Sequence, residues 1–207
     1  MIYLEKTPVI TKKNALSEKN KLRLYPVVLD LFSKKDFHQV NIREIYKLSG
    51  LSPSTIYRYF TSKEDLLFTI LDEKIIEIRE LIKEHIRGLD STKEIFRKVF
   101  WVTLNYYDNN PGVAITAFIT VPMRAWMRED TYTTSEILDI ADKIIEHGKA
   151  KGEIDPAITP QMTRDLYYMF SHRQIYVWYF HQMKWNLVDT IPRFFDQFWK
   201  IMAPKGS

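Results

Sequence analysis

The sequence predicts an all-α fold, with a three-helix N-terminal domain of the helix-turn-helix type and a larger helical C-terminal domain. Helix-start signals recur along the whole chain. Three possible capping boxes, each pairing a side-chain acceptor with a Glu three residues later, begin at Asn41, Thr61 and Ser91. Ser52 and Thr159 each precede a proline, a residue favoured at the first helical position. Strand signals are poor, so we expect no sheet.

These signals also predict where the helices begin and end. We expect the N-terminal domain at 1–62 and the C-terminal domain at 63–204. Gly88 and Gly152 stand where helices should stop. Pro26 lacks an N–H and crowds the carbonyl four residues earlier, so the first helix is either kinked or split there. The expected helices cover 17–35, 41–49, 53–59, 62–87, 91–109, 135–151, 160–184 and 188–202, with shorter helices across 111–131 that break near Pro122.

The composition narrows the class of protein. The chain has 207 residues, 45% of them hydrophobic, which is enough to bury a core without disulfides or metal. It contains no cysteine, which excludes disulfides, thiolate metal sites and cysteine nucleophiles. The N-terminus lacks the apolar core of a signal peptide, and no apolar run approaches the roughly 18 residues of a membrane span. We expect a cytoplasmic protein with no membrane contact.

Enzyme chemistry is not expected. The five histidines form no helical pair four residues apart and no Glu-x-x-His ligand motif. The six glycines form no phosphate-binding loop. The pair Glu129-Asp130 is better interpreted as a solvated turn than as two catalytic carboxylates. We therefore expect no catalytic residue, no metal and no cofactor, and the alternative is a small-molecule enzyme that uses an aromatic cavity.

Residues 41–60, NIREIYKLSGLSPSTIYRYF, have the spacing of a helix-turn-helix. A two-turn helix ends at Gly50, and a tight turn leads into a second short helix at 53–59. Apolar side chains fall on one face of each helix, where they can form a small core with the first helix. The expected core residues are Ile42, Ile45, Leu48, Leu51, Ile56 and Phe60, with Val28, Leu31 and Phe32. The second short helix is then free to turn a polar face outward.

Charge and residue type both suit contact with DNA. Residues 1–63 contain 12 Lys/Arg and 5 Asp/Glu, whereas the rest of the chain contains 18 and 21. This asymmetry indicates a basic end that meets a polyanion, although a solvated basic face has the same pattern. The major groove admits an α-helix, in which Arg58 could bind a guanine and Thr55 a thymine methyl. Hydroxyls and the positive helix N-terminus near Pro53 could bind phosphates.

An ordered pattern extends over about residues 18–78. It consists of Leu31-Phe32, Phe37, Ile45, Gly50-Leu51-Ser52, Ile56-Tyr57, Phe60, Ser62-Lys63-Glu64 and Leu66-Leu67. This pattern resembles the DNA-binding domain of the TetR family of transcriptional regulators. The chain departs from the family where Val28 and Tyr46 replace Ala and Asp36 replaces Gly. Ser54 and Tyr59 also differ, which affects the base contacts more than the fold.

The residues and the resemblance together predict the DNA contacts. The expected set is Arg43, Ser52, Pro53, Ser54, Thr55, Tyr57, Arg58, Tyr59 and Lys63. A basic arm across the phosphates could be formed by Lys12, Lys13, Lys19, Lys21 and Arg23. The resemblance implies a homodimer on double-stranded DNA with a pseudo-palindromic operator, and a repressor released by a small-molecule effector. The alternatives are a ligand-responsive activator and an all-helical protein-interaction adaptor that does not bind DNA.

The C-terminal domain carries more apolar surface than one core face requires. We expect the last two helices to pack on the core on one side and to form a four-helix dimer interface on the other. The candidate interface residues are Tyr167, Phe170, Tyr176, Phe194, Phe195 and Phe198. Aromatic residues are dense between 100 and 180, which predicts a pocket for a large, mainly apolar ligand, such as an acyl chain or an aromatic compound. The candidates are Trp101, Tyr107, Phe118, Trp126, Tyr168 and His172, and the alternative for each is core packing.

Overall fold

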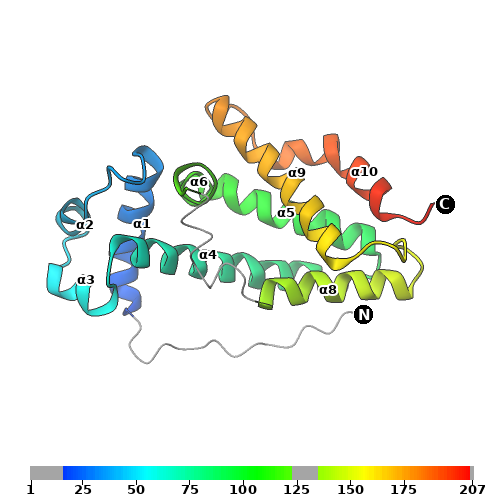
Figure 1. Ribbon diagram of the computed structural model, residues 1–207, viewed down its shortest axis with the longest axis horizontal. Helices are drawn as coiled ribbons and strands as arrows, with labels where there is room; N and C mark the ends of the chain where they lie inside the picture. The colour runs from blue at the N-terminus through cyan, green and yellow to red at the C-terminus, as the bar shows by residue number, and fades with distance from the viewer. Residues whose placement is uncertain (1–15, 123–134, 206–207) are drawn as a thin grey trace. The chain divides into compact units, whose positions relative to one another are not determined.

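The structure, a computed structural model, describes residues 16–122 and 135–205 and contains no β-strand in these ranges (Figure 1). The prediction of an all-α fold is therefore confirmed. The described chain divides into two compact units. The N-terminal unit holds residues 16–76 and 111–122, and the C-terminal unit holds 77–110 and 135–205. None of the helices in the described ranges has the length and apolar character needed to cross a membrane.

The N-terminal unit is built from short helices packed around one small core. Its helices are α1 (Glu18–Lys34), α2 (Ile42–Ser49), α3 (Pro53–Tyr59), the first half of α4 (Lys63–Ile86), α6 (Pro111–Ile115) and the π-helix η1 (Thr116–Thr120). Helix α1 is unbroken at Pro26, which settles the question of whether the proline splits it. Phe32, Ile45 and Ile56 lie at the centre of the core and are almost fully buried.

One expected core residue is wrong. Leu48 is 59% exposed, whereas Ser49 is buried in its place. The buried residues of α2 are Ile45 and Ser49, with Ile42 half-buried on the same face, which places Leu48 at the edge of this stripe. The hydrophobic type of Leu48 therefore did not predict its position, because the neighbouring helices determine which part of the α2 surface is covered.

Local side-chain caps start several of the helices. The Asn41 side chain accepts from the N–H of Arg43 at 2.9 Å, and the Ser52 hydroxyl accepts from the N–H of Thr55 at 3.1 Å. The expected cap at Thr61 is displaced by one residue: α4 begins at Lys63, and the Ser62 hydroxyl accepts from the N–H of Asp65 at 3.0 Å.

The physical reason for this displacement is that Asp65, rather than Glu64, reaches back along the chain. Its carboxylate accepts both the N–H and the hydroxyl of Thr61, at 2.8 and 3.0 Å. The Thr61 side chain is thus occupied outside the helix, and the capping position passes to Ser62.

The C-terminal unit surrounds an aromatic core. It contains the second half of α4, α5 (Thr92–Asn109), α8 (Ser135–Ala150), α9 (Pro160–Phe180), the 3-10 helix η3 (Leu187–Thr190) and α10 (Ile191–Met202). Phe100 of α5 is fully buried, and its ring centroid lies 5.0 Å from those of Tyr167, Phe194 and Phe198. This cluster joins α5, α9 and α10.

The turn after α9 ends that helix earlier than its apolar pattern predicts. Gln182 and Met183 adopt left-handed backbone conformations, with φ of 57° and 58°. The N–H of Met183 donates to the carbonyl of Trp178 at 2.8 Å, and the Trp178 indole N–H donates to the carbonyl of Trp185 at 2.9 Å. These bonds turn the chain back toward η3, where the Asp108 carboxylate accepts the N–H of Leu187 at 2.7 Å.

Candidate DNA-binding surface and effector domain

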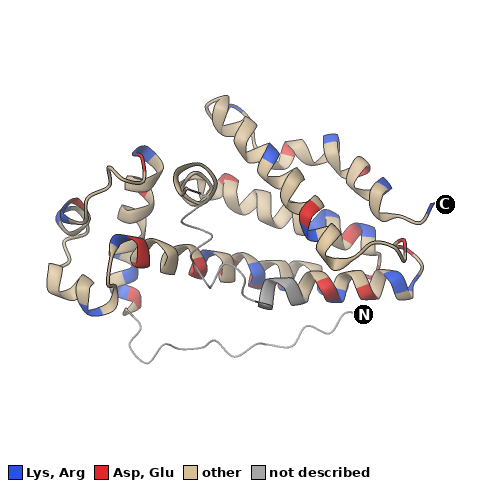
Figure 2. Cartoon of the chain, in the orientation of Figure 1, with Lys and Arg blue, Asp and Glu red and all other residues tan. Residues whose placement is uncertain are grey.

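Helix α3 presents a polar face to solvent. Ser54, Tyr57 and Arg58 are exposed, whereas Ile56 on the opposite face is 1% exposed and anchors the helix in the core. Of the other predicted contacts, Arg43, Ser52 and Pro53 are exposed, and Thr55 and Tyr59 are half-buried. In Figure 2 the Lys and Arg positions, coloured blue on the ribbon, are spread over α1, α2 and α3. This arrangement leaves α3 free to enter the major groove of DNA, which is wide enough to admit an α-helix.

Hydrogen bonds order the start of α3. The Ser52 hydroxyl lies 2.9 Å from the hydroxyl of Ser54 and 2.9 Å from that of Thr55. A hydrogen bond between the Tyr46 and Tyr57 hydroxyls raises the pKa of Tyr46 and links α2 to α3. Tyr46 is therefore part of this surface. The TetR family, which this sequence resembles, usually has Ala at that position. The sequence pattern did not predict a contact between Tyr46 and α3.

The turn between α2 and α3 is held by an arginine from α1. Gly50 adopts φ 65°, a left-handed conformation that glycine tolerates without strain. The Arg23 guanidinium donates to the Gly50 carbonyl at 2.9 Å. Arg23 thus acts on the turn, and Lys21 of the same expected arm bonds to Glu73 at 2.9 Å. Lys12 and Lys13 lie outside the described residues.

Lys63 is also engaged within the N-terminal unit. Its ammonium group donates to the carbonyls of Phe37 and Val40, at 3.0 and 2.9 Å, and lies 5.4 Å from the Phe37 ring centroid. These contacts tie the loop between α1 and α2 to the start of α4. An ammonium group has three N–H donors, so one remains for a phosphate, and that role of Lys63 stays a prediction.

Three of the six candidate ligand residues come from one aromatic region of the C-terminal unit. Burial raises the pKa of Tyr107 well above its ordinary value, and the neighbouring Tyr167 and Tyr168 raise it further. The ring of Tyr168 lies 5.3 Å from that of His172, and burial lowers the pKa of His172. The region therefore combines apolar faces with protonated phenols and a neutral imidazole.

Two of the other three candidates are described by the structure. Trp101 is 38% exposed on α5, where Lys98 lies 5.0 Å from its ring centroid. Phe118 belongs to η1 of the N-terminal unit and is half-buried. Trp126 lies outside the described residues.

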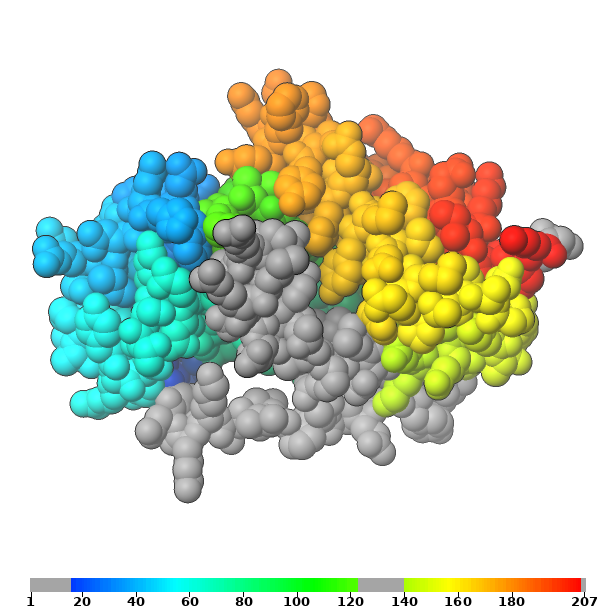
Figure 3. Space-filling model, in the orientation of Figure 1, coloured from blue at the N-terminus to red at the C-terminus, as the bar shows by residue number. Residues whose placement is uncertain are grey.

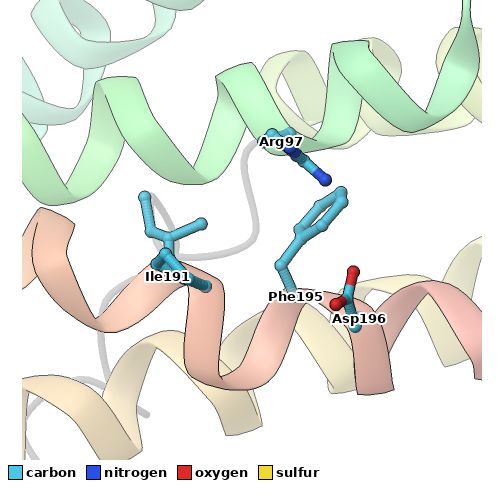
Figure 4. Close-up of a pocket in the computed structure, with 5 residues that line it drawn as sticks. Arg97, Ile191, Phe195 and Asp196 are labelled. Carbon is cyan, nitrogen blue, oxygen red and sulfur yellow. The ribbon is translucent and has the colours of Figure 1, made fainter.

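A small pocket lies between α5 and α10 (Figure 4). It is lined by Arg97, Ile191, Pro192, Phe195 and Asp196, and its volume is about 200 Å³. The Arg97 guanidinium covers the Phe195 ring at 4.8 Å from the centroid. None of the five candidate ligand residues that the structure describes lines this pocket, and it is smaller than the roughly 300–1,000 Å³ typical of ligand sites. We therefore do not assign the effector to it.

The candidate interface residues differ widely in exposure. Phe194, Phe195 and Phe198 are 5%, 1% and 0% exposed within the single chain, because they pack around Phe100. They offer a partner almost no surface. Tyr167 and Phe170 are half-buried, whereas Tyr176 is 46% exposed.

Other exposed apolar residues of α9 were not among the candidates. Met169 is 66% exposed and Phe180 is 80% exposed. Figure 3 shows the end of α9, in orange, at the molecular surface. Their seven- and four-residue spacing from Tyr176 was the sequence signal that could have identified them.

Two family models together cover most of the chain. Residues 29–70 match bacterial regulatory proteins of the tetR family, and residues 71–198 match the C-terminal region of YsiA-like proteins. The chain belongs to the tetR family of bacterial regulatory proteins. As a tetR-family member with a helix-turn-helix unit, it is a DNA-binding transcriptional regulator, which confirms the function predicted from residues 41–60.

Individual relatives agree with this tetR-family assignment. The fatty acid metabolism regulator protein of Bacillus subtilis is 25% identical over 172 residues, covering 81% of this chain and 87% of the relative. The transcriptional regulator UidR of Escherichia coli K12 is 24% identical over 152 residues, 72% and 76% of the two chains.

Solved structures share the tetR-family fold. The crystal structure of FadR from Bacillus subtilis in complex with stearoyl-CoA superposes with a TM-score of 0.79 at 20% identity, covering 88% of this chain and 99% of that one. FadR from Bacillus halodurans gives a TM-score of 0.76 at 16% identity, with 86% and 96% coverage. The relatives described here are regulators rather than enzymes.

Proposed function

We propose that this tetR-family regulator represses transcription as a homodimer and leaves its operator when a long-chain acyl-CoA binds to the C-terminal unit. The observation that carries the DNA-binding part is the outward polar face of α3, with Arg58 exposed and Ile56 anchored in the core. A two-fold dimer presents two such helices, which favours a pseudo-palindromic operator with half-sites about 34–36 Å apart.

The nature of the effector is inferred from relatives and from residue chemistry. A relative is named as a regulator of fatty acid metabolism, and a structure of similar fold holds stearoyl-CoA. The group formed by Tyr107, Tyr168 and His172 offers apolar ring faces and a few polar atoms. That combination suits an acyl chain attached to a polar head.

The homodimer is supported by an exposed apolar stripe on α9. Met162, Met169 and Tyr176 follow one another at intervals of seven residues, and Phe180 follows four residues later. They are 43%, 66%, 46% and 80% exposed. Residues at this spacing lie on one helical face, which the exposed Arg173 interrupts, and exposed apolar residues gathered on one face favour association with a second copy.

The operator and effector are tested in one assay. Duplexes bound by the purified protein are selected from random DNA, and their affinity is measured by fluorescence anisotropy with stearoyl-CoA, free CoA or stearate. We expect stearoyl-CoA alone to weaken operator binding, by roughly 5- to 150-fold. Failure to select any duplex at low salt would contradict the DNA-binding proposal. Release by aromatic compounds only would replace the acyl-CoA proposal.

The dimer is tested separately by light scattering after size-exclusion chromatography. Met169→Asp combined with Phe180→Asp should convert dimers to monomers, because two charges would be placed on the α9 stripe. Lys184→Asp, at an exposed position beyond α9, is the matched control and should stay dimeric. Unchanged dimers in the double variant would place the interface elsewhere.

A further inference from the structure

One face of α1 carries two cations that have no carboxylate partner in the described part of the chain. Lys19 and Arg23 are exposed and lie four residues apart, so they share one face of the helix. Neither belongs to an ion pair there. Lys21 differs, because its ammonium group lies 2.9 Å from Glu73 and 3.2 Å from Glu18. Like charges at the spacing of Lys19 and Arg23 repel each other, and a polyanion beside them would relieve the repulsion.

Arg23 also contacts the turn of the helix-turn-helix. Its Nη2 donates to the carbonyl of Gly50 at 2.9 Å. A Cβ at Gly50 would lie 2.7 Å from the same nitrogen, so the guanidinium occupies the space that a side chain would fill. The glycine therefore serves the turn in two ways: it tolerates φ 65° without strain, and it lets Arg23 approach the backbone.

The contacted turn lies between the end of α2 and the start of α3. The N–H of Gly50 donates to the carbonyl of Tyr46 at 3.0 Å and closes α2, and Ser52 caps α3 two residues later. An arginine has five N–H donors in a rigid planar fork. Within the described residues the Gly50 carbonyl is the acceptor that Arg23 uses, so further donors remain for a phosphate.

We propose that Arg23 is a positioning residue that binds a phosphate of the DNA backbone and the Gly50 carbonyl with one guanidinium, and so fixes α3 relative to the DNA backbone. Lys19, one turn earlier, adds its charge to the same contact. Phosphate contacts set the register of a protein on the duplex, and base contacts then read the sequence. Arg23 thus contributes to affinity through its charge and to specificity through its fork.

Two substitutions in the full chain separate the charge of Arg23 from its fork. Arg23→Gln removes the charge but keeps an amide N–H that can donate to Gly50. It should weaken the operator and a scrambled duplex by the same factor. The slope of log K against log salt concentration should become shallower by about 0.9 for each Arg23 that binds a phosphate.

Arg23→Lys keeps the charge but lacks the planar fork. This variant should keep the wild-type salt slope and the affinity for the scrambled duplex. The ratio of operator affinity to scrambled-duplex affinity should fall by about 3- to 10-fold, because the bond that holds the turn is lost. A wild-type slope in Arg23→Gln, or a wild-type ratio in Arg23→Lys, would overturn the proposal.

Lys34→Gln is the matched control for net charge. Lys34 is exposed near the other end of α1 and pairs with Asp30 at 2.6 Å. Its substitution removes one positive charge and should change neither the slope nor the ratio. A slope reduced as much as in Arg23→Gln would contradict a defined phosphate contact, because net charge alone would then explain the effect.

Hydrogen exchange of the free protein tests the hold on the turn without DNA. The backbone amides of α3 should exchange about 3- to 10-fold faster in Arg23→Lys than in the wild type, and at close to the wild-type rate in Arg23→Gln. Equal exchange in all three proteins would overturn the positioning role. None of these measurements uses stearoyl-CoA, so a failure of the proposed effector would leave their outcome unchanged.

Discussion

Helices α3 and α10 are both amphipathic, but they bury different parts of their surface. In α3 only Ile56 is buried, and Ser54, Tyr57 and Arg58 form an exposed polar face. In α10, Phe194, Phe195 and Phe198 are buried around Phe100. The comparison shows that residue type indicates function where the functional face is exposed. Where aromatic residues are many, most of them are buried in the core, so their presence in the sequence does not identify a ligand site or a partner interface.

The largest expected effect follows from the aromatic core. Phe100→Ala removes the ring at the centre of the contacts among α5, α9 and α10, and should lower the free energy of unfolding by about 3–5 kcal/mol. Denaturant unfolding measures it, with Phe100→Leu as the milder control. A loss below about 1 kcal/mol would mean that this region is loosely packed and is available for a ligand.

The next effect concerns recognition without a change in stability. Arg58→Ala should weaken operator binding by roughly 1–3 kcal/mol if the guanidinium reads a base, with an unchanged melting temperature because Arg58 is exposed. Anisotropy with the operator and with a scrambled duplex measures the loss. Equal weakening on both duplexes would make Arg58 a phosphate contact instead.

A smaller effect is expected at the turn that joins α2 and α3. Gly50→Ala places a side chain at φ 65°, where its Cβ would lie 2.7 Å from the Arg23 guanidinium. The left-handed conformation alone disfavours alanine by roughly 1–2 kcal/mol. Both melting temperature and operator affinity should fall. If only stability falls, the turn does not control the position of α3.

The smallest effect is a pH dependence in the C-terminal unit. Burial lowers the pKa of His172 below its ordinary 6.5, so the unfolded chain binds a proton there more readily than the folded chain. Stability should therefore decline as the pH falls through about 6.5, and His172→Gln should remove part of this decline. Melting temperatures at about pH 7.5 and 5.5 measure it. An identical decline in the variant would assign the pH dependence to other groups.

The sequence by itself determined the features that depend on neighbours within a few residues. The caps at Asn41 and Ser52, the left-handed Gly50 and the polar face of α3 all follow from local chemistry. The TetR resemblance rests on the same local spacing. The expected fold class and the expected DNA-binding function needed nothing more.

Tertiary structure alone decided the features whose partners lie far away along the chain. Leu48 is exposed because the α2 stripe turns toward Ser49, and Lys63 binds carbonyls 23 and 26 residues earlier. The C-terminal phenylalanines are buried because α5 offers them Phe100. The sequence gives the polarity of each side chain. Whether that side chain is buried, and against which helix, depends on packing between segments that are distant in the sequence.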